Sequence, residues 1–137
     1  KLDPEASEPT QGSKSAAGWD LRALEGTTVR KGTSTKIRTG LAVAIPEGWE
    51  GQIRPRSGLA FRQGLSIPNA PGTIDADYRG ELKVLLINLG PEVIQITRGM
   101  RIAQMLITPA PQVEIRVVED LENTERGADG FGSTGTH

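Results

Sequence analysis

The chain has 137 residues, a formal net charge of -1 and a pI near 5.9. This length fits one domain, and the near-neutral charge excludes the sequence-wide basic field that holds polymeric nucleic acid or an anionic membrane. Only 4% of the residues are aromatic, so the core of one chain is small and burial against other subunits is expected. Because there is no cysteine and no long apolar run, we expect a soluble cytoplasmic protein.

Most of the chain is predicted to form short strands. Residues 1–18 are rich in Pro, Ser, Gly and Ala and predict an irregular arm. The following segments are rich in Val, Ile, Leu and Thr and are bounded by Gly, Pro or Asn, which predicts strands at residues 35–45, 49–54, 81–89, 93–96, 101–108 and 112–118. Many short strands without a long helical period favour an all-β barrel or a jelly-roll-like sandwich.

One short helix is predicted at residues 57–63, where Ser57 can cap the start and Gly64 can stop it. Its first turn carries Gly58 and is preceded by Arg56. A helix N-terminus offers free amides and a positive dipole, so Arg56 and the Ser57 hydroxyl predict an anion site suited to phosphate. An ordinary helix cap beside a surface arginine remains the alternative.

The segment 72–80 places two carboxylates and the only tyrosine between two glycines. In an extended chain Asp75 and Asp77 would share one face and Tyr78 would lie on the other. The segment is also a good turn sequence, so a hairpin could bring Asp75 and Tyr78 around one ligand. A solvated turn without function is the alternative.

The C-terminal segment 126–135 contains four glycines, two hydroxyl side chains, Arg126 and Phe131, a composition that cannot build a core. It lacks the Gly-Lys-Ser/Thr ending of a Walker loop. We therefore expect a closing arm whose amides and Arg126 hold phosphates while Phe131 covers a flat ring, with a frayed terminus as the alternative.

The inventory of reactive side chains is short. The single histidine, His137, is the last residue, and without cysteine the chain has no Ser-His-Asp triad, Cys-His pair or Cys/His zinc site. Chemistry must therefore use carboxylates, hydroxyls, arginines, backbone amides or a metal brought by the substrate.

Five segments, taken together, resemble the five ordered motifs of the trimeric dUTP diphosphatases (dUTPases). They are Ala-Ala-Gly-Trp-Asp-Leu-Arg-Ala at 16–23, Arg-Pro-Arg-Ser-Gly-Leu-Ala at 54–60, Gly-Thr-Ile-Asp-Ala-Asp-Tyr-Arg-Gly at 72–80, Arg-Gly-Met-Arg-Ile-Ala-Gln at 98–104 and Arg-Gly-Ala-Asp-Gly-Phe-Gly-Ser-Thr-Gly at 126–135. The resemblance covers nearly the whole chain. Trp19, Thr73 and Met100 depart from the residues most frequent in the family, but none removes a group that the chemistry needs.

The resemblance implies hydrolysis of dUTP to dUMP and diphosphate by water attack on the α-phosphorus, which keeps uracil out of DNA and supplies dUMP for thymidylate synthesis. It implies Mg²⁺ held by the substrate phosphates and water, with no direct protein ligand. It also implies a distorted jelly-roll, or β-clip, barrel at residues 1–122, with one short helix. A flexible C-terminal arm at 123–137 would close over a neighbouring subunit's site in a homotrimer.

The resemblance also assigns roles to single residues. Asp75 would activate the water, and Tyr78 would pack on the deoxyribose and exclude a 2′-hydroxyl. Asp20 would be a supporting carboxylate. The other substrate-binding positions are Asn69, Gly72, Thr73, Ile74 and Lys83 around the uracil, Arg56, Ser57, Gly58 and Gln104 around the phosphates, and Arg126, Gly130, Phe131, Gly132 and Ser133 in the arm.

Two other functions stay open. The related dCTP deaminases share the fold and the phosphate site, but they use a glutamate beside the base, where this sequence has the Asp75 and Tyr78 segment. A non-catalytic module that senses the nucleotide is the second alternative.

Overall fold

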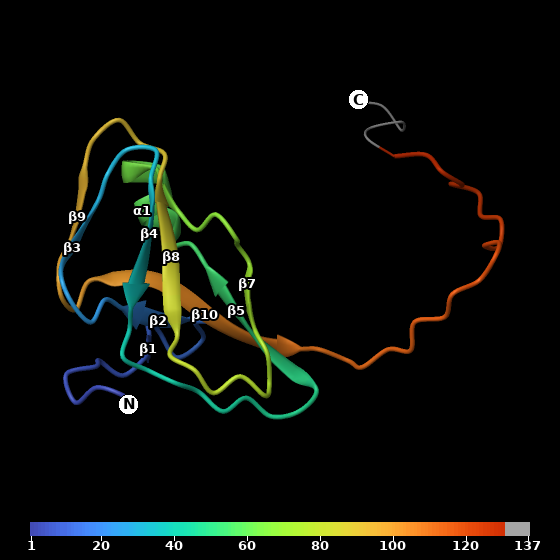
Figure 1. Cartoon of the computed structure of the whole chain (residues 1–137), viewed down its shortest axis with the longest axis horizontal. Coiled ribbons are helices and arrows are strands. Elements are labelled where there is room, and N and C mark those ends of the chain that lie inside the picture. The colour runs from blue at the N-terminus through green and yellow to red at the C-terminus, as the bar shows by residue number, and fades with distance from the viewer. Residues whose placement is uncertain (131–137) are drawn as a thin grey trace.

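The protein is described by a computed structural model that covers residues 1–130 (Figure 1). Within these residues the chain forms short strands and one helix, which confirms the all-β prediction. The elements are β1 (Thr10–Gln11), β2 (Trp19–Arg22), β3 (Thr27–Val29), β4 (Ser34–Arg38), β5 (Trp49–Arg54), α1 (Ser57–Gln63), β6 (Leu65–Ser66), β7 (Gly72–Ile74), β8 (Lys83–Asn88), β9 (Ile94–Ile96) and β10 (Arg101–Pro109).

The strands form three antiparallel sheets. The largest has five strands in the order β1-β2-β10-β5-β7, and the others are β4-β8-β6 and β3-β9. Strand β10 is the centre of the largest sheet, because it pairs with β2 on one side and with β5 on the other. As a result Gln104 of β10 lies opposite both Asp20 of β2 and Arg54 of β5. The sheet thus brings three segments distant in sequence to one place.

A single core lies between the sheets. It joins Leu21 of β2 and Ile102 of β10 to Ile37 of β4 and to Val84 and Leu86 of β8. Alternate residues of β8 are buried, as expected for a strand with one face on the core. Each of these aliphatic side chains contributes about 1.5–3 kcal/mol when fully buried.

Helix α1 has the predicted bounds, but its start differs from the prediction. Arg56 is the N-cap residue and makes no side-chain capping hydrogen bond, so Ser57 is the first helical residue rather than the cap. Gly64 ends the helix as predicted, with a left-handed φ of 66° and its N–H donated to the carbonyl of Ala60. Leu59 is the residue through which the helix packs on the core.

Two predicted strands differ in the structure. The strand predicted at 35–45 ends at Arg38, because Thr39 donates its hydroxyl to the carbonyl of Leu82 (2.7 Å) and Gly40 turns the chain with a φ of 70°. The strand predicted at 112–118 is not formed within the single chain. The segment alternates apolar and polar residues, but Val113, Ile115 and Val117 are 77%, 87% and 98% exposed, and within residues 1–130 no strand pairs with them.

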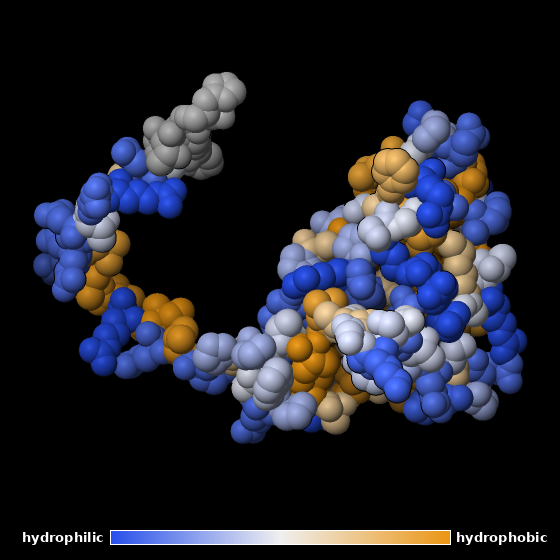
Figure 2. Space-filling view, turned by 180° about the vertical axis from the view of Figure 1, so that it is seen from behind, coloured by the Kyte–Doolittle hydropathy of each residue, from blue (hydrophilic) through white to orange (hydrophobic). Residues whose placement is uncertain are grey.

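Beyond β10 the chain leaves the packed domain (Figure 1). Figure 2 shows apolar residues spaced along this segment, away from the domain. Within residues 1–130, no helix has the length and apolar character needed to cross a membrane.

Candidate active site

The first hollow of the domain, the hairpin pocket, has a volume of about 260 Å³ and lies between β5, β7 and β8. Its lining brings together all the residues predicted around the uracil and the sugar, and the sequence analysis missed Glu81 among them. The lining residues are Ile53, Ile67, Asn69, Gly72, Thr73, Ile74, Asp75, Tyr78, Glu81, Lys83, Val84 and Leu85.

Asp75 and Tyr78 reach the same pocket through a turn that follows β7. Strand β7 pairs with β5, with Ile74 opposite Gly51, and the chain then turns so that the Tyr78 N–H donates to the Asp75 carbonyl at 3.1 Å. The turn therefore brings both side chains to one cavity, as expected. The flanking strands do not form the predicted hairpin, because β7 pairs with β5 whereas β8 pairs with β4 and β6. Within residues 1–130 no hydrogen bond or ion pair engages the Asp75 carboxylate, so its oxygens are available to a ligand or a water molecule.

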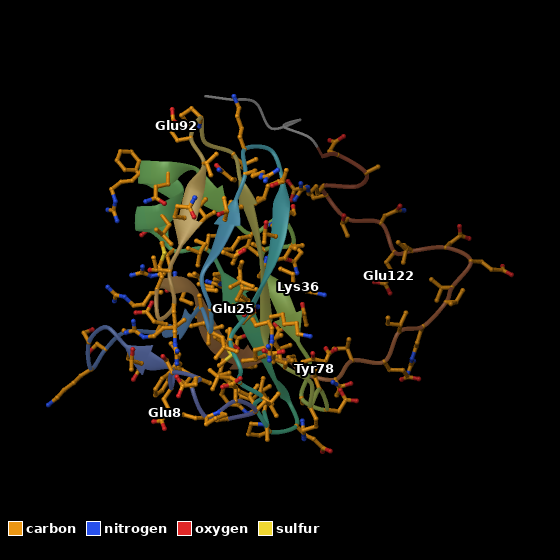
Figure 3. All side chains as sticks on the ribbon, turned by 60° about the vertical axis from the view of Figure 1, so that its left-hand side comes forward. Glu8, Glu25, Lys36, Tyr78, Glu92 and Glu122 are labelled. Carbon is orange, nitrogen blue, oxygen red and sulfur yellow. The ribbon has the colours of Figure 1, made fainter. Side chains whose placement is uncertain are left out.

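Two features of the same turn hold the ring of Tyr78, whose place in the domain is labelled in Figure 3. Its hydroxyl donates to the Glu81 carbonyl at 3.0 Å. A Cβ at Gly80 would lie 2.4 Å from the Tyr78 hydroxyl oxygen, so only glycine leaves room for the ring there. Gly72 has a similar role, because a Cβ there would approach the Asn69 amide nitrogen to 3.2 Å.

Glu81 is the centre of a cluster of charges at the pocket wall. Its carboxylate accepts hydrogen bonds from Arg38 Nε at 3.1 and 3.2 Å and from the Gly40 N–H at 3.0 Å, and Lys83 Nζ lies 3.6 Å away. Burial alone would raise the pKa of this carboxyl. The Gly40 hydrogen bond and the positive charges of Arg38 and Lys83 outweigh burial, so the pKa of Glu81 is lowered and the group is ionised at neutral pH.

The second hollow, the arginine cradle, has a volume of about 370 Å³ and collects the residues predicted around the phosphates, together with Asp20. Its lining consists of Gly12, Ala16, Ala17, Gly18, Asp20, Arg54, Arg56, Ser57, Gly58, Arg101, Gln104 and Leu106. Gln104 donates from Nε2 to the Pro55 carbonyl at 3.1 Å. A Cβ at Gly18 would lie 2.7 Å from Gln104 Oε1, so a larger residue there would displace this amide.

Asp20 organises the cradle. One carboxylate oxygen lies 3.2 Å from Arg56 Nε and the other 3.0 Å from an Arg101 guanidinium nitrogen. Arg56 also donates to the Arg101 carbonyl at 3.3 Å. The two guanidinium groups are thus held side by side, and such a pair suits phosphate oxygens.

The hairpin pocket and the arginine cradle share no lining residue. The arm positions Arg126 and Gly130 line neither hollow of their own chain. Arg126 instead donates from Nε to the Asp129 carbonyl at 3.0 Å. The remaining arm positions, Phe131, Gly132 and Ser133, lie outside the described residues.

Comparison with known proteins identifies the family of this chain. The family model described as dUTPase matches residues 4–135. The chain belongs to the dUTPase family, and it is an enzyme. A curated dUTPase of Nautilia profundicola, named deoxyuridine 5'-triphosphate nucleotidohydrolase, is 55% identical over 135 residues, which cover 98% of this chain and 95% of the relative. A relative of the same name from Rhizobium rhizogenes is 54% identical and covers 93% of this chain and 84% of its own.

Solved dUTPases have the same fold. The dUTPase of Staphylococcus bacteriophage 80alpha, in a mutant form with dUpNHpp, has a TM-score of 0.87 and 31% identity, covering 98% of this chain and 95% of its own. A mutant of the S. aureus phage phi11 dUTPase has a TM-score of 0.81 and 28% identity, and the match covers 89% of this chain and 95% of that protein's chain. Its structure reveals the coordination of a structural Mg(II) ion. These neighbours confirm the jelly-roll type of fold.

Two arginines of this dUTPase were missed as site residues by the sequence analysis. Arg54 and Arg101 both line the cradle, and both lie inside the quoted motifs. The signal that identifies them is the register of the large sheet. It sets Arg101 opposite Arg22 of β2, the strand of Asp20, and sets Arg54 of β5 opposite Gln104 of β10. That register is not visible in the sequence.

Proposed function

We propose that the chain hydrolyses dUTP to dUMP and diphosphate, with Asp75 as the base that activates the attacking water. The observation that carries the proposal is the hairpin pocket, where the unengaged Asp75 carboxylate and the fixed ring of Tyr78 face one cavity. The curated relatives are named for this reaction, and the 80alpha dUTPase has been solved with the analogue dUpNHpp.

The pocket supplies the groups that recognition of deoxyuridine requires. The Asn69 amide and the backbone of β7 offer donors and acceptors to the uracil edge, and a base that leaves them unpaired is penalised. The Tyr78 ring would lie against the sugar and leave no room for a 2′-hydroxyl. Lys83 adds a positive charge at the wall of the same pocket.

The cradle supplies the phosphate site. Arg56 and Arg101, with Arg54 from the neighbouring strand, give a positive surface, and Ser57, Gly58 and Gln104 add hydrogen-bonding groups. These residues would act by positioning the triphosphate and by stabilising the charge that develops on its oxygens, not as nucleophiles.

Mg²⁺ is proposed to enter as the chelate of the triphosphate. Within residues 1–130 there is no group of three or more carboxylate or histidine side chains that could hold a cation. The Asp20 carboxylate is engaged by two guanidinium groups, so it supports the cradle rather than caging a metal. When bound to the phosphates, the cation would neutralise part of their charge.

A homotrimer with sites between subunits is proposed because, within one chain, the hairpin pocket and the arginine cradle are separate. The pocket and the cradle share no residue, and the described part of the arm reaches neither. The exposed alternating segment 112–118 has the pattern of a half-buried strand, so its partner is expected on another copy. On this view residues 1–122 form the barrel and residues 123–137 close a neighbour's site.

The test of the proposed base is the Asp75→Asn variant. Turnover of dUTP should fall by about 10²–10⁴-fold, the usual contribution of a positioned base, while the Kd for the non-hydrolysable analogue dUpNHpp should be largely kept. Both quantities are measured on the same preparation, by diphosphate release and by calorimetry.

The matched control is Glu92→Gln, which makes the same carboxylate-to-amide change at an exposed site. Figure 3 shows Glu92 at the opposite end of the domain from Tyr78. The control should keep wild-type turnover. An Asp75→Asn variant as active as the control would contradict the assignment of the base.

A further inference from the structure

Glu81 lies in the wall of the hairpin pocket, yet the proposed reaction gives it no role. Its side chain is only 12% exposed, and it carries a charge beside the space proposed for the sugar. A nearly buried carboxylate that is fully hydrogen-bonded holds its neighbours in place, because moving any of them would leave the charge unpaired.

The carboxylate of Glu81 is fixed from three directions. Arg38 at the end of β4 donates to both oxygens, the Gly40 N–H donates to one, and Lys83 at the start of β8 lies beside the other. These groups come from two neighbouring strands, since Arg38 and Lys83 are directly opposite in the register of β4 and β8.

The backbone next to Glu81 is fixed as well. The Leu82 N–H donates to the Leu41 carbonyl at 2.7 Å, and the Thr39 hydroxyl donates to the Leu82 carbonyl at 2.7 Å. The short segment 81–82 is therefore clamped to the segment 38–41 by both its side chain and its main chain. Its peptide groups have little freedom to shift.

The clamped segment holds Tyr78. The Tyr78 hydroxyl donates to the carbonyl of Glu81, and the ring lies over Gly80, where no Cβ intervenes. The position of the ring therefore depends on the position of the Glu81 carbonyl. A shift of that carbonyl would be passed directly to the ring, because no other described hydrogen bond holds the phenol.

We propose that Glu81 is a positioning residue, whose contacts to Arg38 and Gly40 hold the Tyr78 ring against the sugar and thereby set the preference for deoxyribose over ribose. The inference rests on the proposed function, since it concerns the sugar of that substrate. A wall that excludes a hydroxyl by contact works only if it is rigid, because a ring free to move by about 1 Å makes room for the extra atom.

The test compares kcat/KM for dUTP and UTP, both with Mg²⁺, in the wild type, Glu81→Gln and Arg38→Gln. Glutamine keeps the size of residue 81 but removes the charge that binds Arg38. Arg38→Gln breaks the same contact from a residue that does not line the pocket. In both variants the ratio of kcat/KM for dUTP to kcat/KM for UTP should fall, because UTP is used better relative to dUTP. In Glu81→Gln this ratio should fall by about tenfold.

The matched control is Glu8→Gln, which removes a carboxylate that pairs with Lys1 at 4.0 Å on the exposed surface. Figure 3 shows Glu8 on the opposite side of the domain from Tyr78. The control should keep the wild-type ratio. Thermal melting of every variant establishes that the fold is kept.

A second readout connects Glu81 to Tyr78. Tyr78→Phe removes the hydroxyl that meets the Glu81 carbonyl, and the effects of Tyr78→Phe and Glu81→Gln on the ratio should not add in the double variant. Additive effects, an unchanged ratio in Glu81→Gln, or an equal loss for both substrates would each overturn the inference. A wild type that is silent towards dUTP would instead contradict the proposed function, on which the inference depends.

Discussion

Asp75 and Asp20 lie in different electrostatic surroundings. Both oxygens of Asp20 are engaged by arginines, so this carboxylate is a fixed anion that orients cations. Within residues 1–130 the Asp75 carboxylate has no such partner and faces the hairpin pocket. The proposed base must have an oxygen within reach of the attacking water, and the unengaged oxygens of Asp75 meet this requirement whereas those of Asp20 are occupied.

The lowered pKa of Glu81 predicts how its contribution to stability depends on pH. A carboxyl whose pKa is lower in the folded than in the unfolded state stabilises the fold above its unfolded pKa, about 4.3, and loses this contribution as the pH falls through the folded pKa. The wild type should therefore melt at a higher temperature than Glu81→Gln at pH 7. The difference should narrow as the pH falls below about 4.

Melting curves of the two proteins from pH 7 to pH 3 test this prediction. A difference in Tm that stays constant over the whole range would show that the charge of Glu81 does not stabilise the fold. Glu8→Gln serves as the control, since its pair with Lys1 is solvent-exposed.

Single residues were predictable to the extent that their role is local. Asp75 and Tyr78 stand three positions apart in a turn sequence, and the turn alone brings them together. Glu81 was not predictable, because its partner Arg38 is 43 positions away and only the pairing of β4 with β8 joins them. Arg101 was missed for the same reason, since its partner Asp20 is 81 positions away.

At the scale of elements, β4, β5, β8, β9 and β10 formed where the sequence predicted strands. The strands that the sequence analysis missed are short, with two to four residues each. Strands β5, β8 and β10 have enough residues to show a pattern of burial, whereas β6, with two residues, has none. The sequence analysis predicted a turn in segment 72–80 and did not predict β7. Its three residues pair with β5, and this pairing holds Asp75 at the pocket.

The junction between α1 and β6 depends on Gly64. Its φ of 66° favours glycine, and a Cβ there would lie 2.6 Å from the Gly90 backbone nitrogen. Gly64→Ala should therefore lower the free energy of unfolding by about 2 kcal/mol or more, from backbone strain together with the clash.

Gly99→Ala is the matched control for this prediction. Gly99 has a similar φ of 77°, but a Cβ there would meet nothing within 4 Å. The free energy of unfolding of Gly99→Ala should therefore be only about 1 kcal/mol below that of the wild type. Urea unfolding at one fixed protein concentration measures both values, and equal losses would show that the contact between Gly64 and Gly90 does not matter.

At the scale of the whole molecule, the hairpin pocket and the arginine cradle, the two proposed parts of a nucleotide site, are separate hollows of one chain. The segment 112–118 leaves the domain with its apolar side chains exposed, as Figure 2 shows. The alternation of apolar and polar residues predicted a strand there, but the described part of the chain supplies no partner strand. Assembly with other copies would explain both observations, and one sequence shows neither which strands pair between copies nor how the hollows meet.

Mixing two inactive variants tests the split site. Asp75→Asn lacks the base of the pocket, and Arg56→Gln lacks a cation of the cradle, so each protein alone should have little activity. If a site takes its pocket from one subunit and its cradle from another, a trimer formed from both variants contains some intact sites. Random association of equal amounts restores about one quarter of the sites.

The two variants are mixed by co-expression, and diphosphate release is measured per subunit. We expect the mixed trimers to recover activity towards about one quarter of the wild-type value per subunit. No recovery, with mixed trimers demonstrated by mass, would mean that each site is built within one chain.

The central claim is tested most directly by measuring diphosphate release with Mg²⁺ from dUTP, dTTP, dCTP and UTP side by side, with the base of each product identified. We expect release from dUTP alone, because the proposed pocket would reject the methyl group of thymine, the amino group of cytosine and the 2′-hydroxyl of ribose. Ammonia from dCTP would show a deaminase instead, and the absence of product from all four substrates would contradict the proposed reaction.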